Sequence, residues 1–396
     1  MSVPSRHFVL VIHALSGGGA ERVMVEMAGH WVARGDRVTL VTLDEGQRDV
    51  YVCDPRVERI ALNVMGQSRG IGHALVQNWR RVRSLRAAIR QADPDGIVAF
   101  TEQINVLTLL ANWGRATPVI IGERTDPRFH PVPRIWSWLR RQCYWACSAA
   151  VVQNEAVRAW LQPLVGRAPV VTIPNYVQRP SVTEWESAQQ IRRQRKAGQR
   201  VLIAAGRLAE EKRFDFLIDV FSAVDLEVRK DWQLQIYGEG PCRSALASQI
   251  EQLGMGEQVR LCGWTSELGT QLAAADLFAL TSRYEGFPNV LLEAMVRGLP
   301  VVCNDCPSGP TEIIRHGQDG LLLPVEDRKE WTATLTRLFQ SEPLCNQLGH
   351  EALAVAERFN PDRFYARWET LFQQTGIPGA LAQATVNEGR RPSLRQ

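Results

Sequence analysis

The stretch Phe8-Val-Leu-Val-Ile12, followed by Ser16-Gly-Gly-Gly-Ala20, decides the fold. The first run is apolar throughout, as in a strand buried on both faces, and the glycines indicate a turn. A helical pattern then runs from Glu21 to Trp31, and a second strand-like run follows at Arg37-Val-Thr-Leu-Val-Thr-Leu43. A strand, a glycine-rich turn, a helix and a strand in this order predict a doubly wound parallel sheet.

The same alternation of strand and helix patterns continues along the chain and is interrupted once. Between residues 179 and 200 Ser, Gln, Glu and Arg dominate, which is typical of a solvated helix or linker. A second alternating series opens at Val201-Leu-Ile-Ala-Ala205. The sequence therefore predicts an α/β protein with two Rossmann-like parallel-sheet domains. Because ligands bind at the carboxyl ends of parallel strands, both domains are expected to face one interdomain cleft.

The pattern also predicts domain boundaries. We expect a first domain at 1–178, a linker at 179–200 and a second domain at 201–360. A helix at 361–376 is expected to return to the first domain, and residues 377–396 are expected to form a disordered tail.

Length and composition support this division. A chain of 396 residues, 45% hydrophobic and 22% charged, suits two globular domains, and a net charge of +4 does not by itself indicate nucleic acid. The eight cysteines are scattered in apolar runs, which suits reduced thiols in a cytosolic protein. We see no signal peptide and no apolar run of the ~18 residues that a membrane span needs. The expected location is the cytoplasm, at most at the inner face of its membrane.

The glycine-rich turn is the first candidate binding element. Glycine lets the backbone approach a ligand, and a helix N-terminus offers free N–H groups, so Gly18 and Gly19 suit a phosphate or a sugar oxygen. A tight turn without a ligand is the alternative, because the stretch lacks the full spacing of a dinucleotide-binding motif.

A basic loop follows the first strand of the second series. In Gly206-Arg207-Leu-Ala-Glu-Glu-Lys212 a guanidinium and an ammonium group could together neutralise a diphosphate and the charge that grows on it as it leaves. The neighbouring Glu210 and Glu211 leave open a solvated charged loop.

The most specific segment reads Thr281-Ser-Arg-Tyr-Glu-Gly-Phe-Pro-Asn-Val-Leu-Leu-Glu293. Asn289 is predicted to be the N-cap of a helix, with Glu285 on the loop before it and Glu293 one turn inside. Two carboxylates so placed suit the hydroxyls of a sugar ring and of a ribose, while helix N–H groups face phosphates. The alternative is an exposed Glu on an amphipathic helix.

The segment from Glu285 to Glu293 resembles the E-x7-E element of the retaining family 4 glycosyltransferases, which have the two-domain GT-B architecture. The order of the other motifs is also similar to that family, up to about residue 372. These motifs are Gly17 to Ala20, Ile173-Pro-Asn175, Gly206-Arg207 with Lys212, Tyr237-Gly-Glu-Gly240, Cys262-Gly-Trp264 and Pro307-Ser-Gly-Pro-Thr-Glu312.

The resemblance implies a nucleotide-diphosphate sugar, with UDP or GDP, as the donor. Arg207 and Lys212, after Gly206, would hold its diphosphate, Glu285 the transferred sugar and Glu293 the ribose. Arg207, Lys212 and Glu285 form the implied catalytic set.

Backbone groups complete the implied donor site. Gly286 and Phe287 would offer N–H groups beside the sugar or phosphate, and Asn289 and Val290 would lie beside the diphosphate.

The acceptor side departs from the family pattern. Many members carry a His after the strand that matches residues 118–121, and this chain has Arg124 and Asp126 there instead. Both are candidates for the acceptor side, and a structural Arg–Asp pair is the alternative. GT-B enzymes generally use protein cations instead of a metal, so neither a metal nor a cofactor is implied. The single D-x-D, Asp93-Pro-Asp95, is typical of a turn.

The segment from Arg128 to Trp145 is basic and aromatic and contains no acidic residue. Such a helix can lie at an anionic bilayer surface, which suits the polyprenyl-diphosphate-linked acceptors of similar family members. A core helix with an arginine fringe is the alternative. The basic cluster at 192–196 is interpreted as a solvated linker face, and neither cluster matches a nucleic-acid-binding motif.

These observations predict a retaining hexosyltransferase that transfers a hexose or N-acetylhexosamine to a glycan or lipid-linked acceptor in surface polysaccharide or glycoconjugate synthesis. Two alternatives remain. One is a sugar-nucleotide-binding subunit without turnover, and the other is a GT-B sugar-nucleotide epimerase.

Overall fold

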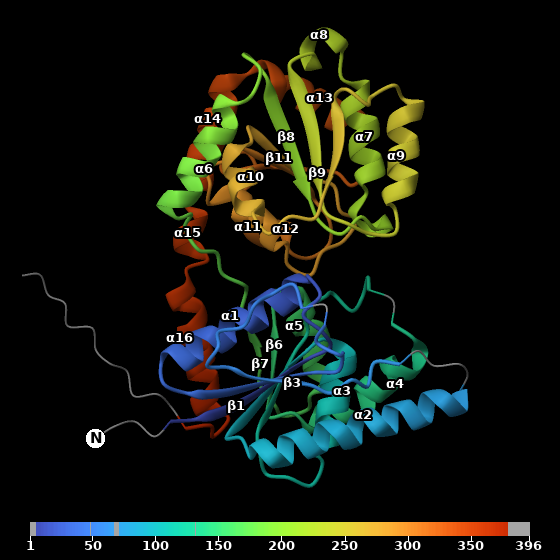
Figure 1. Ribbon diagram of the computed structural model, residues 1–396, viewed down its shortest axis with the longest axis vertical. Helices are drawn as coiled ribbons and strands as arrows, with labels where there is room; N and C mark the ends of the chain where they lie inside the picture. Colours follow the sequence, from blue (N-terminus) through green and yellow to red (C-terminus); the bar gives the residue numbers. More distant parts are fainter. Residues whose placement is uncertain (1–4, 48, 67–70, 131, 379–396) are drawn as a thin grey trace, which may run out of the picture.

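The computed structural model describes residues 5–47, 49–66, 71–130 and 132–378, and it contains two α/β domains (Figure 1). The first domain holds a seven-stranded sheet in the order β3-β2-β1-β4-β5-β6-β7, and the second a six-stranded sheet in the order β10-β9-β8-β11-β12-β13. Every strand pairing in both sheets is parallel. The predicted fold class, two doubly wound parallel-sheet domains, is confirmed.

The elements of the first domain, in chain order, are β1 (His7–Ile12), α1 (Gly19–Ala33), β2 (Arg37–Thr42), β3 (Glu58–Ala61), α2 (Ile71–Ala92), β4 (Gly96–Phe100), α3 (Glu102–Asn112), β5 (Val119–Gly122), α4 (Arg134–Cys143), η1 (Tyr144–Ala146), β6 (Ala149–Val152), α5 (Glu155–Leu161), η2 (Gln162–Leu164) and β7 (Val170–Thr172). Strand β3 was not predicted. It is a short edge strand with no fully buried residue, so no apolar run marks it.

The remaining elements are α6 (Val182–Arg193), β8 (Arg200–Ala205), η3 (Glu210–Lys212), α7 (Phe214–Ala223), α8 (Leu226–Arg229), β9 (Trp232–Tyr237), α9 (Arg243–Gln252), β10 (Val259–Gly263), α10 (Leu268–Ala274), β11 (Leu277–Leu280), α11 (Asn289–Met295), β12 (Val301–Asn304), α12 (Pro310–Ile313), β13 (Leu321–Leu323), α13 (Arg328–Gln340), α14 (Glu342–Ala352), α15 (Val355–Arg358) and α16 (Pro361–Gln374).

The segment expected to be a solvated linker is largely a helix packed on the second domain. Ala188 of α6 is buried against α10, and Arg192 donates to the carbonyl oxygens of residues 273–275 at 2.7–3.2 Å. Arg195 pairs with Asp276 at 2.7 Å. The interpretation of this basic cluster as a solvated face was therefore wrong for Arg192 and Arg195, because the end of α10 presents carbonyl groups that need donors, whereas Arg193 and Lys196 are exposed.

Each central strand contributes to a core on both faces of its sheet. In β1, Phe8, Leu10 and Ile12 pack on one side, whereas Val9 and Val11 pack on the other. This alternation explains why the run is apolar without interruption. It also leaves the ends of the strands as the only parts of the sheet that can present polar groups to a ligand.

Helix α16 packs against the first domain although it follows the second in the chain. In Figure 1 it runs beside α1. The rings of Trp368 and Phe372 contact Trp31 at centroid distances of 6.3 and 5.3 Å, and Phe372 lies 4.9 Å from Phe8. The expected tail begins with Ile377, which is 1% exposed in the same core, and residues 379–396 lie outside the described residues.

The chain crosses between the domains twice, at neighbouring places. The outward crossing contains Val177, whose N–H donates to the carbonyl oxygen of Phe359 on the returning crossing at 3.0 Å. The two connections therefore form a single hydrogen-bonded strap on one side of the molecule.

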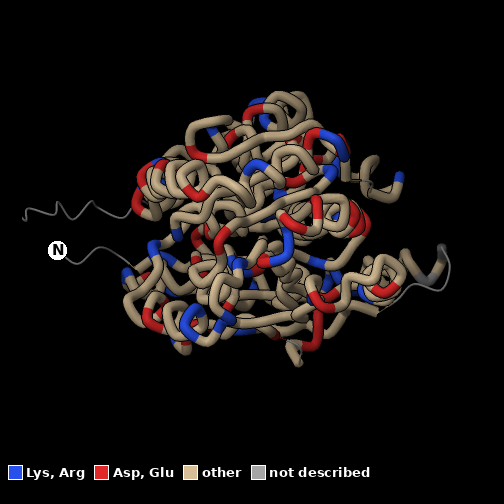
Figure 2. The backbone as a smooth tube through the Cα atoms, turned by 90° about the horizontal axis from the view of Figure 1, so that it is seen from above, with Lys and Arg blue, Asp and Glu red and all other residues tan. Residues whose placement is uncertain are grey.

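Charged residues of both signs are interspersed over the view in Figure 2, in keeping with the small net charge. No helix in the described part of the chain is long and apolar enough to cross a membrane.

Replacing Trp368 with Ala tests how far α16 stabilises the first domain. The side chain is fully buried, so its loss is expected to lower the free energy of unfolding by roughly 3–5 kcal/mol. The exposed Gln373 on the same helix provides a matched Ala control, expected to change it by less than about 0.5 kcal/mol. Urea unfolding followed by tryptophan fluorescence and by circular dichroism measures both. Equal stability of the two variants would contradict the role of α16.

Candidate active site

The glycine-rich turn after β1 lies at the boundary between the domains. A Cβ atom added to Gly19 would lie 3.1 Å from Nδ2 of Asn289 in the second domain. The N–H groups of Gly17 and Gly18 donate to the carboxylate of Glu21 at 2.8 and 3.0 Å. The turn faces the second domain as expected, but its shape is held by Glu21, and the N–H group of Gly18 is already used.

Glu21 is almost fully buried, and it also pairs with His13 at 3.0 Å. Burial opposes its ionisation, but hydrogen bonds from His13 and Gly18 outweigh burial and lower the pKa of the carboxyl below its usual value. Glu21 is therefore a charged structural anchor for the turn.

The basic loop after β8 places Arg207 and Lys212 differently. Arg207 is exposed and pairs with Glu211 at 2.7 Å, whereas Lys212 is largely buried and pairs with Glu285 at 2.7 Å. The loop lies directly on the turn after β9. A Cβ atom on Gly238 would come within 1.9 Å of the carbonyl oxygen of Gly206, so only glycine permits this approach.

Glu285, on the loop after β11, is 8% exposed. Its Oε1 atom accepts both the Lys212 ammonium at 2.7 Å and the Ser282 hydroxyl at 2.6 Å. Its Oε2 atom makes no hydrogen bond with any residue that the structure describes. Lys212 likewise uses one of its three donors on Glu285, so each member of the pair has capacity left for a ligand.

Glu293, one turn inside α11, forms an ion pair across the domain boundary. Its Oε1 atom accepts from Nη2 of Arg22 on α1. Within the described chain its Oε2 atom is also without a hydrogen bond. Neighbouring carboxylates raise the pKa of Arg22, with Glu293 the first of them, although burial opposes this rise. Arg22 was not singled out in the sequence, although it lies one turn after the glycines.

A chain of polar side chains crosses the boundary at the start of α11. Arg124 donates to Oδ1 of Asn175, and Nδ2 of Asn175 donates to Oδ1 of Asn289 at 2.6 Å. The expectation that Asn289 caps α11 was therefore wrong. Pro288 occupies the cap position, and the Asn289 amide is used in this interdomain contact.

Arg124 and Asp126 do not pair with each other, so the predicted alternative of a structural Arg–Asp pair was also wrong. The Arg124 guanidinium lies 4.4 Å from the centroid of the Phe100 ring, and its Nε and Nη1 atoms are buried without a partner. Burial lowers the pKa of Arg124 to about 9. A buried guanidinium with unused donors still has the capacity to donate hydrogen bonds.

Asp126 joins the domains through Ser308. It pairs with Arg128 at 2.6 Å and accepts the Ser308 hydroxyl from the loop before α12. Burial opposes ionisation here too, but the hydrogen bonds from Arg128 and Ser308 lower the pKa of Asp126.

The remaining candidates lie around the start of α11. The Phe287 side chain packs into the second-domain core against Phe359, and Val290 is partly buried against the same core. Gly286 lies against the first domain, where an added Cβ atom would come within 2.3 Å of the Arg124 carbonyl oxygen.

Cys303 and Cys306 are both buried and free. No group of three or more His, Cys, Asp and Glu side chains in the described ranges is arranged to hold a metal ion.

Two family models match the chain, one in each domain. The first domain matches the glycosyl transferase 4-like domain over residues 18–176, and the second matches the glycosyl transferases group 1 family over residues 186–354. The two matches together cover every strand of both sheets except β1, which lies before residue 18, and they include Arg22, Asn175, Lys212, Glu285 and Glu293. The chain therefore belongs to the GT-B glycosyltransferases, and the predicted class is confirmed.

Relatives agree with this class. The chain is 22% identical over 368 residues to a Campylobacter jejuni protein named as an N-acetyl-D-galactosaminyltransferase acting on a diphosphate-undecaprenol-linked glycan, covering 92% of this chain and 97% of the relative. It is 34% identical over 237 residues to an exopolysaccharide phosphotransferase of Streptomyces coelicolor, covering 58% of this chain and 24% of that longer protein. The chain thus spans about a quarter of the second relative's length.

A solved structure confirms the fold. The Anabaena protein HepE in complex with UDP and glucose aligns with a TM-score of 0.75 at 19% identity, covering 93% of this chain and 99% of that one.

The close approach of Gly286 to Arg124 allows a test of how closely the two domains pack against each other. A Gly286→Ala variant is expected to push the domains apart and to lower glycosyl transfer at least about tenfold, because small displacements of a site cost large factors in rate. Gly256→Ala is the matched control, since nothing lies within 4 Å of its added Cβ atom. Transfer rates measured with radiolabelled nucleotide sugar compare the two, and unchanged transfer in Gly286→Ala would contradict the close contact.

Proposed function

We propose that the chain is a retaining, metal-independent glycosyltransferase. It moves a hexose or N-acetylhexosamine from a UDP- or GDP-sugar to a glycan or a polyprenyl-diphosphate-linked acceptor in surface polysaccharide or glycoconjugate synthesis. The arrangement of Glu285 and Glu293 carries this proposal. Each carboxylate has one oxygen held by a cation and one oxygen without a partner among the described residues. Two such oxygens suit two sets of sugar hydroxyls.

Lys212 and Arg207 supply the positive charge that a departing diphosphate requires. The two free donors of Lys212 bind phosphate oxygens, while the exposed Arg207 exchanges Glu211 for phosphate. Charge that develops on the leaving oxygen is stabilised most by cations already in position, and the Glu285 contact holds Lys212 in place.

Retention of configuration follows from attack on the face that the diphosphate leaves. The anomeric carbon–phosphate oxygen bond breaks, the acceptor oxygen bonds to the same face, and its proton passes to the departing phosphate. Arg124, with its unused buried donors, binds the acceptor side.

The acceptor side also suggests a membrane contact through residues 128–145, at the cytoplasmic face. Helix α4 has a buried side and an exposed side. Trp136 and Arg140 are buried in the core, whereas Ile135 and Trp138 are exposed, as is Trp145 beyond the helix. Exposed apolar rings beside Arg134 and Arg141 suit an anionic bilayer surface.

Lys212→Ala tests the donor assignment. We expect transfer and donor hydrolysis to fall roughly 100–1,000-fold, because one electrostatic contact to the developing charge is lost. Lys230→Ala, which removes an exposed ammonium from the same domain, is the control with unchanged rate. Each protein is incubated with a panel of UDP- and GDP-sugars, with and without lipid extract, and the products are identified by mass spectrometry. The anomeric configuration of the product is determined by NMR.

The same panel separates the alternatives. Equal rates in wild type and Lys212→Ala would remove Lys212 from the site. Free epimer without an acceptor would indicate an epimerase, and binding without any turnover would indicate a non-catalytic subunit.

The membrane contact has its own test. Replacing Ile135 and Trp138 with Asp is expected to lower co-sedimentation with phosphatidylglycerol vesicles several-fold, since both lose apolar contact with lipid. Trp264→Asp, at a similarly exposed ring in the second domain, controls for lost surface tryptophan. Partitioning that drops equally in both variants, or in neither, would argue against α4 as the contact.

A further inference from the structure

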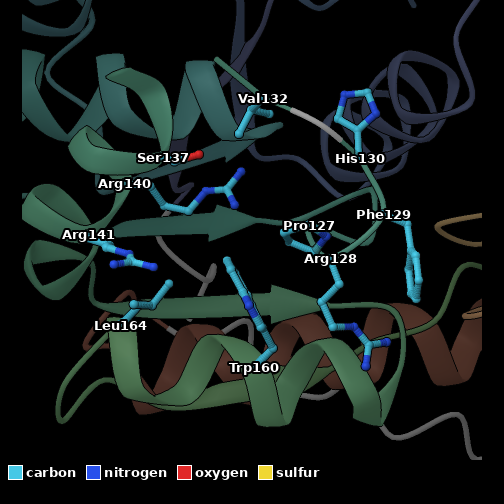
Figure 3. A pocket seen from close by; sticks show the side chains of 10 residues that line it. All are labelled: Pro127, Arg128, Phe129, His130, Val132, Ser137, Arg140, Arg141, Trp160 and Leu164. Atoms are coloured by element: carbon cyan, nitrogen blue, oxygen red, sulfur yellow. The ribbon is translucent and has the colours of Figure 1, made fainter. Parts of the chain in front are cut away.

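A pocket of about 440 Å³ opens in the first domain, between the loop after β5, helix α4 and helix α5. Figure 3 shows Arg128 from the loop, Arg140 and Arg141 from α4, and Trp160 from α5 around it. No acidic side chain is among the described residues that line it, and His130 and Ser137 add further polar groups. The donor-site residues described above lie elsewhere, so the donor does not account for this pocket.

The pocket has unused capacity to bind an anion. Arg141 is exposed and makes no ion pair or hydrogen bond with any described residue. Arg128 bonds Asp126 through Nε and Nη2, which leaves Nη1 open. Arg140 is nearly fully buried, and its ion-pair partner is Glu123 at 3.4 Å.

The charge balance around Arg140 favours an added anion. Burial raises the pKa of Glu123 to about 7, even though Arg140 and a hydrogen bond from Tyr144 oppose the rise. Burial therefore disfavours the negative charge on the carboxylate that faces Arg140. An added anion would give this buried guanidinium a second counter-charge.

Aromatic rings hold two of the guanidinium groups in place. Arg140 lies 5.4 Å from the centroid of Trp160, and Arg128 lies 5.4 Å from that of Phe129. Such stacking leaves the edges of the guanidinium free to donate, and planar edges bind phosphate oxygens in pairs. The groups are thus oriented in advance, which lowers the entropy cost of binding.

The pocket is connected to the domain boundary by one residue. Arg128 bonds both Asp126 and, at 3.3 Å, the hydroxyl of Ser308 in the second domain. The residue after Ser308, Gly309, lies against Pro288 at the start of α11. Arg128 thus belongs both to the pocket and to the contact between the domains.

We propose that this pocket binds the phosphate or diphosphate group of the acceptor and so determines which acceptors are used. The proposal rests on the glycosyltransferase function given above. The phosphate belongs either to a lipid-linked diphosphate or to a phosphodiester within a glycan. Both present the same oxygens to Arg128, Arg140 and Arg141, and the exposed apolar side of α4 distinguishes them, since only the lipid-linked form has a chain to place there.

The test compares Arg141→Ala with Arg134→Ala. Both remove one exposed arginine from α4, but Arg134 does not line the pocket. Binding of radiolabelled farnesyl diphosphate, inorganic diphosphate, farnesol and poly(ribitol phosphate) is measured in a Lys212→Ala background, which weakens binding at the donor site. Loss of a charged contact in the pocket is expected to weaken phosphate binding about tenfold in Arg141→Ala and less than about twofold in Arg134→Ala.

The probes distinguish the sources of the phosphate. If farnesyl diphosphate binds more tightly than both inorganic diphosphate and farnesol, and this binding depends on Arg141, the result supports a lipid-linked acceptor. If poly(ribitol phosphate) instead binds more tightly than farnesyl diphosphate, and this binding depends on Arg141, the result supports a phosphodiester glycan. Phosphate binding that is the same in both variants for every probe would overturn the proposal.

The outcome is independent of the donor test. If transfer depends on Lys212 but phosphate binding does not depend on Arg141, only the proposal for the pocket is refuted. Arg141-dependent phosphate binding in a protein without any transfer would refute the proposed function and leave the pocket as a binding site.

Discussion

The aromatic contact between α16 and the first domain is the interaction on which the two-domain arrangement depends. Trp368 and Phe372 complete a core that Trp31 and Phe8 begin, so the first domain lacks part of its interior until the end of the chain has returned. Because the second domain lies between these segments in sequence, burial of α16 also brings that domain back to the first. The cleft is thus a consequence of how one hydrophobic core is closed.

The cleft that results is electrostatically balanced within the protein. Lys212 is paired with Glu285, Arg207 with Glu211, and Arg22 with Glu293. Such pairing stabilises charges that would otherwise be desolvated alone, and it leaves selected donors and oxygens unused. A ligand with negative phosphates and neutral hydroxyls can then bind to these unused donors and oxygens.

Sequence patterns predicted the parts of the molecule that depend on local chemistry. The apolar runs of β1 and β8 identified central strands. The loops after two strands, β8 and β11, identified Lys212 and Glu285, which the structure brings within 2.7 Å of each other. Strand β3 was missed because an edge strand needs no apolar run. Arg22 and Asn175 were not assigned contacts across the boundary, and Asn289 was wrongly predicted to cap α11, because their partners depend on how the two domains meet. That geometry leaves no periodic signal in the sequence.

The hydrogen bond between Val177 and Phe359 has a mechanical consequence. Two adjacent, bonded connections would be disturbed less by a rotation of the domains about the line through them than by sliding or separation of the domains. Helix α4 lies on the side of the molecule opposite α15 and α16 (Figure 1). Points on that side sweep the widest arc for any given rotation. The hydrogen bond between Asp126 and Ser308 joins the second domain to the segment that leads to α4, so a rotation that widened the cleft there would have to break it.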